Sequence, residues 1–248
     1  GADTTAMMCE LFGRATGYNH GKGGSMHIAD FAVGMLGANG VVAAGIPIAV
    51  GAAHSAKIRN SSAIVACFFG DGAINRGPFL EGLNWAKVYE LPVLFVCEDN
   101  RYSATTATDT MTAGDGAAAR ALSLDIPAVT VDGNDVLAVH EAAKKLVAEI
   151  RAGSGPRLLH ALTYRVKGHV SVDPAAYRQQ SEVEEALESD PIKLAAARLA
   201  AEGISVAAIE AAAKAEIDAA VAAASAAAFP SPELAYTDIQ NTGAGQWH

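Results

Sequence analysis

The sequence predicts an α/β fold with a doubly wound, mostly parallel sheet and helices on both faces. Two apolar runs, 64–69 and 92–97, are short and rich in β-branched and aromatic residues, as buried parallel strands are. The stretch 74–90 between them is long enough for the crossover helix that parallel neighbours require. Strand-like and helix-like stretches continue to alternate along the chain, which is typical of a doubly wound sheet.

The part of the chain before the first strand is expected to be a helix end, a loop and a second helix. Residues 4–12 are predicted to end a helix. The stretch 13–40 has seven glycines from Gly13 to Gly37 and is expected to be an extended loop region. Residues 41–58 are mostly small and apolar, which predicts a helix that packs closely against a sheet.

The part after the second strand begins with residues 103–116, whose Thr, Ala, Gly and Asp content predicts a mobile surface loop. We expect one domain over 1–248, with a helical C-terminal region at about 182–228 and a tail at 229–248. The later elements are predicted in this order: strand 128–132, amphipathic helix 136–150, strand 157–163, polar segment 164–180, helix 190–202 and an Ala-rich helix at about 205–228, packed through Ile209, Ala213, Ile217 and Val221.

Composition narrows the class of protein. The 248 residues are 51% hydrophobic, which is enough for a sizeable core. The net charge of −9 without a basic cluster argues against nucleic acid or an anionic membrane surface as partner, and no apolar stretch is long enough to span a bilayer. Cys9, Cys67 and Cys97 lack metal-like spacing and are expected to be buried thiols in a reducing, cytoplasmic location. Because the chain starts at Gly1 rather than Met, a mitochondrial matrix location stays open.

Polar residues follow both apolar runs at once: Gly70-Asp71-Gly72 after the first and Asp99-Asn100 after the second. The carboxyl ends of strands face the ligand crevice of an open α/β sheet, so these residues are expected at one site. Mg²⁺ prefers oxygen ligands, and Asp71, Asn100 and the carbonyl of Tyr102 would supply three. The glycines are expected to adopt positive φ and to expose N–H groups to phosphate. The alternative is a simple turn at a strand end.

Four ordered motifs narrow the identity further. They are the segment 21–27 (GKGGSMH), the segment 39–42 (NGVV), GDGAINRG at 70–77 with EDNRY at 98–102, and YRVKGH at 164–169 followed by Asp173-Pro174 and Tyr177-Arg178. With these motifs, residues 4–239 resemble the α subunit of the thiamine diphosphate-dependent E1 component of 2-oxo acid dehydrogenase complexes, of the pyruvate or acetoin dehydrogenase type. The resemblance implies the thiamine diphosphate-binding fold.

The resemblance implies a role for each matching residue. Mg²⁺ would be held by Asp71, Asn100 and the Tyr102 carbonyl. Contacts to the cofactor are implied for Gly40, Val42, Gly70, Asp71, Gly72, Ala73, Asn100, Tyr102 and His169. Positions at the catalytic channel are implied for His169, Arg165, His27 and Ser25.

Several of these and other residues also have a simpler interpretation. His169 could be a surface-loop histidine, and His27 could cap a Gly-rich turn. For His54, His140 and His160 an ordinary core or surface position is favoured, and Trp85 and Tyr89 are expected to pack on the crossover helix. The acidic stretch 182–188 is most simply a solvated helix face.

The resemblance implies an enzyme that uses thiamine diphosphate and Mg²⁺ to decarboxylate a pyruvate-like 2-oxo acid or to cleave acetoin. The acyl group would pass to lipoamide on the lipoyl domain of an E2 acyltransferase. An E1 β subunit would supply the glutamate that activates the cofactor, in an α2β2 heterotetramer, so this chain alone is expected to be inactive. Two alternatives stay open: a non-catalytic or degenerate α/β phosphate-binding assembly protein, and a transketolase-like thiamine enzyme half.

The sequence departs from the family pattern in two places that matter here. The family usually has Asn-Asn where this chain has Asp99-Asn100, although the ligand-bearing second position is retained. Nothing in this chain matches the N-terminal segment whose Tyr-Arg pair also grips the cofactor. The chain is therefore expected to be a fragment, or a short subunit with weakened cofactor binding.

Overall fold

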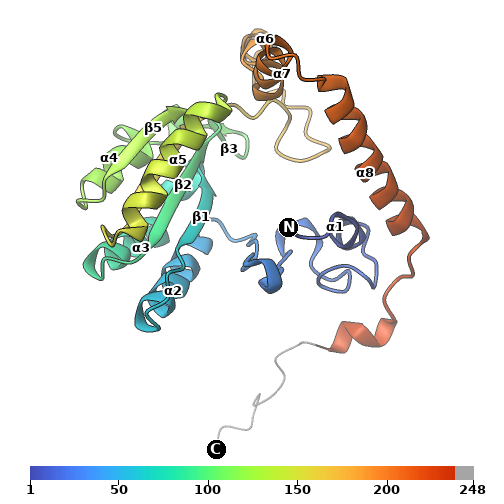
Figure 1. Cartoon of the computed structure of the whole chain (residues 1–248), viewed down its shortest axis with the longest axis horizontal. Coiled ribbons are helices and arrows are strands. Elements are labelled where there is room, and N and C mark those ends of the chain that lie inside the picture. Colours follow the sequence, from blue (N-terminus) through green and yellow to red (C-terminus); the bar gives the residue numbers. More distant parts are fainter. Residues whose placement is uncertain (238–248) are drawn as a thin grey trace, which may run out of the picture. The chain divides into compact units, whose positions relative to one another are not determined.

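The computed structural model describes residues 1–237 (Figure 1). The chain divides into two compact units. Unit 1 combines residues 1–40 with the C-terminal segment that starts at Ser205, and unit 2 is the continuous stretch 41–204.

Unit 2 is built on a parallel sheet of four strands in the order β1-β2-β6-β5. In that order the strands are Val65–Gly70, Val93–Asp99, Arg157–Leu162 and Ala128–Asp132. β2 pairs with β1 on one side and with β6 on the other, so it is a central strand. The parallel sheet agrees with the sequence prediction, and β2 is buried as predicted. β1 is buried on one face only, because its Ala66 and Phe68 are exposed.

Helices cover both faces of this sheet, as predicted. α2 (Gly45–Ile58), α3 (Gly77–Val88) and α4 (Gly116–Leu122) enclose one core, which includes Phe69 and Phe95. α5 (Val136–Arg151) covers the other core, which includes Val96. Successive strand residues point to opposite faces, so Phe95 and Val96 enter different cores. The doubly wound, two-faced architecture is therefore confirmed (Figure 1).

The segments that follow β1 and β2 are more ordered than predicted. The stretch 74–90 is not one helix, because a 3₁₀ helix, η3 (Asp71–Asn75), precedes α3. The expected loop 103–116 is largely structured: β3 (Tyr102–Ser103) and β4 (Thr106–Ala107) form an antiparallel hairpin, followed by the 3₁₀ helix η4 (Thr108–Thr110). No pattern in the sequence predicts α4, in which the buried residues are Ala117 and Ala121.

The end of unit 2 follows β6 through a segment without helix or strand, 163–179, as predicted for a polar segment. Two helices come next, α6 (Gln180–Glu188) and α7 (Pro191–Ala201). Asp190 caps α7 by accepting the backbone N–H groups of Ile192 and Lys193.

Unit 1 pairs α1 (Thr4–Leu11) with the long α8 (Val206–Ala226), and it also contains the 3₁₀ helices η1 (Gly24–Met26), η2 (Phe31–Val33) and η5 (Pro232–Tyr236). The buried residues of α8 are Ala220 and Ala224. The predicted packing residues Ile209, Ala213, Ile217 and Val221 are all exposed. That prediction is wrong, because small alanines make the close contact. Residues 238–248 of the expected tail lie outside the described chain.

Glu10 organises the glycine-rich loop of unit 1. Its side chain is buried, with 1% of the residue exposed. One carboxylate oxygen accepts the backbone N–H groups of Asn19 (2.8 Å) and Gly21 (2.9 Å), and the other accepts those of Gly23 (2.7 Å) and Gly24 (3.1 Å). The loop therefore folds around a single charge.

Two further predictions can be compared with the described residues. Cys9, Cys67 and Cys97 are buried free thiols, as expected, and burial raises the pKa of the Cys67 thiol to about 11. Between residues 1 and 237, no helix combines the length and the apolarity that crossing a membrane would require.

Candidate functional site

The polar ends of β1 and β2 meet at one edge of the sheet, as predicted. Gly70, the last residue of β1, is in register with Glu98 near the end of β2. Asp71 follows the first strand directly, and Asp99-Asn100 closes the second. Because the two strands are parallel neighbours, these residues share the carboxyl edge, where ligands bind in open α/β sheets.

Asp71 is a buried carboxylate at this edge, with 2% of the residue exposed. Its Oδ2 accepts a hydrogen bond from the hydroxyl of Thr108 in η4. Burial raises the pKa of Asp71, and the negative charge of Asp99 raises it further. Backbone N–H groups and the Arg165 guanidinium act in the opposite direction without reversing the shift. The site therefore holds a negative charge that a cation would stabilise.

Asn100 lies in a tight turn that is held by side chains. Its Oδ1 accepts the backbone N–H of Tyr102 at 3.2 Å, and Asp99 Oδ1 accepts that of Arg101 at 3.2 Å. Arg101 has a φ of 71°, the left-handed conformation. The carbonyls of Asp99 and Asn100 accept the N–H groups of Thr163 (2.8 Å) and Arg165 (3.3 Å), which join the turn to the end of β6.

The glycines beside Asp71 have a different role from the one predicted. Neither Gly70 nor Gly72 is among the glycines with positive φ in residues 1–237, and Gly70 is extended, with φ −84° and ψ 167°. A Cβ at Gly72 would collide with the Ser103 side chain, and it would lie 2.7 Å from Ser103 Cβ. Gly72 is therefore needed for close approach of the β3–β4 hairpin rather than for its backbone angles.

Arg165 joins the turn to the loop that carries His169. Its Nη1 lies 3.4 Å from the Tyr102 carbonyl and 3.4 Å from His169 Nδ1. Its Nη2 donates to the Ala104 carbonyl (2.5 Å) and to the Tyr177 hydroxyl (3.1 Å). The His169 side chain is exposed, so the loop presents an imidazole to solvent beside a fixed guanidinium.

Asp173 and Glu182 fasten the same loop. Asp173 Oδ2 accepts the backbone N–H of His169 (2.7 Å) and the hydroxyl of Tyr177 (2.9 Å). Glu182 Oε1 accepts the hydroxyls of Tyr102 (2.7 Å) and Tyr164 (2.8 Å). Burial and the Glu182 carboxylate raise the pKa of Tyr102 to about 12. The prediction that 182–188 is only a solvated face is therefore wrong for Glu182.

The predicted site residues fall into two groups. Unit 2 brings together Asp71, Gly72, Asn100, Tyr102 and Arg165, and it places His169 beside Arg165; Gly70 and the buried Ala73 flank Asp71. Val42 belongs to unit 2 and is 57% exposed, just before α2. Ser25, His27 and Gly40 belong to unit 1, where His27 Nδ1 lies 2.8 Å from the Gly23 carbonyl. A role for these four residues at the cofactor stays a prediction.

Sequence reasoning missed Thr108 and His160. Thr108 was placed in a surface loop, and His160 was given an ordinary position in a strand. His160 is buried, and its Nε2 lies 2.9 Å from Asp99 Oδ2. The signal that could have found His160 is a lone polar residue inside the apolar run of β6, two residues before that strand ends.

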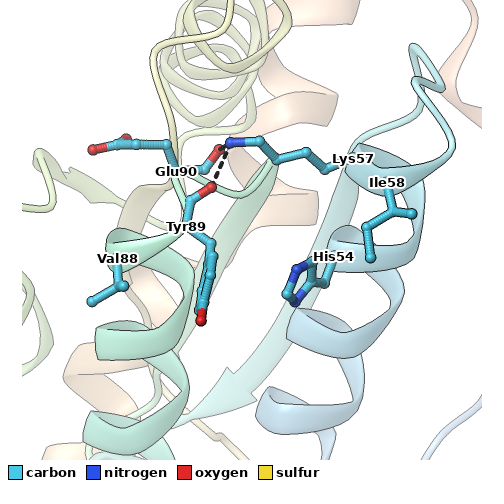
Figure 2. A pocket seen from close by; sticks show the side chains of 6 residues that line it. All are labelled: His54, Lys57, Ile58, Val88, Tyr89 and Glu90. Atoms are coloured by element: carbon cyan, nitrogen blue, oxygen red, sulfur yellow. Dashed lines mark hydrogen bonds between the residues drawn. The ribbon is translucent and has the colours of Figure 1, made fainter.

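A second feature of unit 2 is a hollow beside α2 and α3 (Figure 2). The C-terminal ends of α2 and α3 form a hollow of about 360 Å³ lined by His54, Lys57, Ile58, Val88, Tyr89 and Glu90. Lys57 Nζ donates to the carbonyls of Tyr89 (2.5 Å) and Glu90 (3.2 Å). His54, Trp85 and Tyr89 pack ring against ring, but Trp85 and Tyr89 remain 48% and 43% exposed, so the predicted packing of these two aromatics is only partial. No carboxylate–amide pair of the kind at the carboxyl edge lines this hollow.

Comparison with known proteins decides the family. A family model described as the dehydrogenase E1 component matches residues 1–236. The chain belongs to this family. Among curated E1-type relatives, the α subunit of acetoin:2,6-dichlorophenolindophenol oxidoreductase from Bacillus subtilis is 48% identical over 194 residues, covering 78% of this chain and 58% of the relative. The pyruvate dehydrogenase E1 component α subunit from Zymomonas mobilis is 39% identical over 246 residues, covering 96% and 69%.

The chain thus spans between 58% and 69% of the length of these two relatives of the E1 component family. A solved structure described as a thiamin diphosphate-dependent enzyme from Mycobacterium smegmatis has a TM-score of 0.43 and 21% identity, covering 53% of this chain and 24% of that one.

Proposed function

We propose that this chain is the α-subunit part of a thiamine diphosphate- and Mg²⁺-dependent E1 dehydrogenase. Its substrate would be a pyruvate-like 2-oxo acid or acetoin, since the relatives named above are pyruvate and acetoin enzymes. The observation that carries the proposal is the buried Asp71 carboxylate beside the Asn100 turn at the carboxyl edge of the sheet. Family membership supports it independently.

The residues present fit a magnesium ion. Mg²⁺ takes hard oxygen ligands and is usually held by one or two carboxylates together with water and substrate phosphates. Asp71 offers a carboxylate whose raised pKa signals uncompensated charge, and Asn100 and Tyr102 offer neutral amide and carbonyl oxygens. Residues 1–237 contain no cluster of three or more His, Cys, Asp or Glu placed to bind a metal. The ligand set proposed here contains one carboxylate, that of Asp71, and would therefore not appear as such a cluster.

The residues also fit a diphosphate next to that ion. The buried Nε of Arg165 has no hydrogen-bond partner within the described part of the chain, and its guanidinium lies beside exposed His169. An anion can accept charge-assisted hydrogen bonds from such donors.

When bound, thiamine diphosphate would supply a nucleophilic carbon and an electron sink for cleavage next to a carbonyl. This chain would contribute the cation site through Asp71 and Asn100 and the phosphate contact through Arg165. The Asp173 and Glu182 hydrogen bonds would hold the His169 loop in place at the mouth of the site. A β subunit would complete the active centre in an α2β2 assembly, and lipoamide on an E2 acyltransferase would accept the acyl group.

Calorimetry on the full chain tests the proposal directly. Thiamine diphosphate is titrated in the presence of Mg²⁺, and again after the metal has been removed with a chelator. We expect binding that depends on Mg²⁺. Equal binding without the metal, or no binding in either condition, would favour the non-catalytic phosphate-binding alternative.

A second experiment tests the substrate and the partner. The chain is assayed alone and with a matched β chain for acceptor-linked oxidation of pyruvate, acetoin and 2-oxoisovalerate. We expect no turnover by the chain alone, and turnover of pyruvate or acetoin with the β chain. Turnover by the single chain would contradict the requirement for a β subunit.

A further inference from the structure

A buried acid–base pair lies directly behind the candidate metal site. Asp99 and His160 come from the adjacent strands β2 and β6, and Asp99 Oδ2 lies 2.9 Å from His160 Nε2. Their side chains are only 17% and 7% exposed. The mechanism proposed above uses neither of them.

The two oxygens of Asp99 act on different structures. Oδ2 accepts from His160, which is fixed in the sheet, and Oδ1 accepts the backbone N–H of Arg101 at 3.2 Å. Arg101 has a φ of 71°, a conformation that a non-glycine residue adopts only when its surroundings hold it there. The Asp99 carboxylate therefore connects the rigid sheet to the turn that contains Asn100.

The same turn positions the other groups of the site. Asn100 Oδ1 accepts the N–H of Tyr102, and the Arg101 carbonyl accepts the N–H of Thr108 at 3.0 Å. Thr108 in turn donates to Asp71. A displacement of Arg101 would therefore reach the Asn100 amide, the Tyr102 carbonyl and the Thr108 hydroxyl together.

We propose that His160 is a positioning residue for the metal site, which acts by holding Asp99 so that the 99–102 turn presents Asn100 and the Tyr102 carbonyl to a divalent cation. This inference rests on the proposed function and deepens it. Groups that orient metal ligands from outside the ligand set commonly change metal affinity by about 10- to 100-fold when they are removed. Gly116, the first residue of α4, lies close to this imidazole, since a Cβ there would be 3.3 Å from its Cε1.

The test compares His160→Ala, His160→Gln and Asp99→Ala in the full chain. Each variant is titrated with thiamine diphosphate over a range of Mg²⁺ concentrations. We expect about a 10-fold or larger rise in the Mg²⁺ concentration needed for half-maximal binding in His160→Ala and in Asp99→Ala. His160→Gln keeps an N–H donor near the position of Nε2 and should restore most of the affinity. The double variant, His160→Ala with Asp99→Ala, should bind no worse than Asp99→Ala alone, because His160 acts only through Asp99.

A matched control comes from the other end of β6. Arg157 Nε lies 2.7 Å from Glu149 Oε2, and Arg157 is as buried as His160. Glu149→Gln breaks this ion pair at the amino edge, away from the candidate site. We expect its metal requirement to stay within about twofold of the wild type, even where its thermal stability falls.

Hydrogen–deuterium exchange adds a readout independent of binding. In His160→Ala without ligand, the amides of 99–108 should exchange faster, whereas those of Glu149→Gln in the same segment should not change. Wild-type protein that shows no Mg²⁺-dependent binding would overturn the proposed function itself. Wild-type binding with unchanged metal requirements in His160→Ala, His160→Gln and Asp99→Ala would overturn only the positioning role. The positioning role would also be overturned if Glu149→Gln, at an equal loss of thermal stability, lost as much metal affinity as the His160 and Asp99 variants.

Discussion

Glu10 in unit 1 and Asp71 in unit 2 are almost equally buried, at 1% and 2% exposed, yet their pKa values shift in opposite directions. Burial raises the pKa of Glu10, but its four backbone hydrogen bonds outweigh burial, and the net pKa is lowered. Burial also raises the pKa of Asp71, and there the nearby charge of Asp99 adds to the effect. The difference lies in the donors that surround each carboxylate.

This contrast separates a structural charge from a charge that is available to a ligand. Glu10 has its hydrogen-bonding capacity filled by the loop it organises, so nothing further is needed to keep it ionised. Asp71 accepts from the Thr108 hydroxyl and from backbone N–H groups, but these donors do not outweigh its burial and the nearby charge of Asp99. A divalent cation would stabilise the negative charge of the Asp71 carboxylate, which the fold alone does not fully stabilise. The same conservative substitution should therefore have opposite consequences at the two positions.

The largest effect is expected for Glu10→Gln. Whichever way the new amide turns, its NH₂ group faces two backbone N–H donors, from either the Asn19–Gly21 or the Gly23–Gly24 pair. Two buried donors then lose their acceptor, and we expect unfolding free energy to fall by about 3 kcal/mol. Urea unfolding measures this. The control is Glu216→Gln, whose exposed carboxylate contacts Thr4 and should change stability by less than about 0.5 kcal/mol. If Glu10→Gln lost as little unfolding free energy as Glu216→Gln, Glu10 would not be a structural charge and its contrast with Asp71 would fail.

The sheet could be predicted from sequence because its first two strands are continuous apolar runs, which can be assigned from the local sequence alone. The run ending at Cys97 is buried on both faces, and burial on both faces removes the polar alternation. The run ending at Phe69 is equally apolar, although its Phe68 is 65% exposed. α4 could not be predicted, because a helix of seven residues with two buried alanines carries almost no periodic signal. The packing residues predicted for α8 were wrong for a related reason. The large apolar residues of this helix lie outside the contact that Ala220 and Ala224 make.

The site was predictable where strand ends determine it and unpredictable where strand order does. Asp71 and Asn100 follow two strands that pair directly, so their proximity follows from the crossover rule. His160 reaches Asp99 only because β6 inserts beside β2, ahead of β5, and no local pattern specifies that order. Thr108 reaches Asp71 only through the β3–β4 hairpin. Contacts that depend on the pairing of strands far apart in the sequence can be identified only from the structure.

The second largest effect is expected for Asp71→Asn. Loss of the carboxylate should weaken Mg²⁺-dependent binding of thiamine diphosphate by about 100-fold or more, since removing even an indirect partner of a metal ligand costs about 10- to 100-fold. Without ligand, however, the variant should be at least as stable as the wild type, because a buried, uncompensated charge is removed. Calorimetry and urea unfolding measure the two results.

Glu98→Gln is the matched control for Asp71→Asn. Glu98 lies at the same edge of the sheet but is exposed, and its backbone is in register with Gly70. Both its cofactor affinity and its stability should stay close to those of the wild type. If Asp71→Asn destabilises the free protein as much as Glu10→Gln does, Asp71 is a structural charge and the distinction drawn above fails.

A smaller effect is expected when a methyl group is added beside each carboxylate. The Cβ of Gly72→Ala would meet the side chain of Ser103, which can move, so we expect a loss of about 1–2 kcal/mol. Adding Ser103→Gly should recover most of that loss. The counterpart beside Glu10 is Gly17→Ala, whose Cβ would lie 2.6 Å from the backbone N and Cα of Glu10 and cannot be accommodated so easily. Denaturation midpoints should therefore fall further for Gly17→Ala, and equal losses would show that the two surroundings are equally rigid.

The smallest effect is expected in the pH dependence of stability, and it should have opposite signs at the two carboxylates. The folded-state pKa of Glu10 is below its ordinary value of 4.5, so its stabilising contribution is present above that value and is lost as pH falls through the lowered pKa. The folded-state pKa of Asp71 is above its ordinary value of 3.8, so its contribution is present below that value and is lost as pH rises through the raised pKa. Each pKa unit corresponds to about 1.4 kcal/mol.

Urea unfolding between about pH 4 and pH 8 should thus show the stability gain of Asp71→Asn shrinking toward acid, because the wild-type carboxyl becomes protonated there. The penalty of Glu10→Gln should stay constant over the same range and shrink only at lower pH. A gain for Asp71→Asn that grows toward acid would mean that Asp71, like Glu10, is stabilised in its charged form by the fold alone.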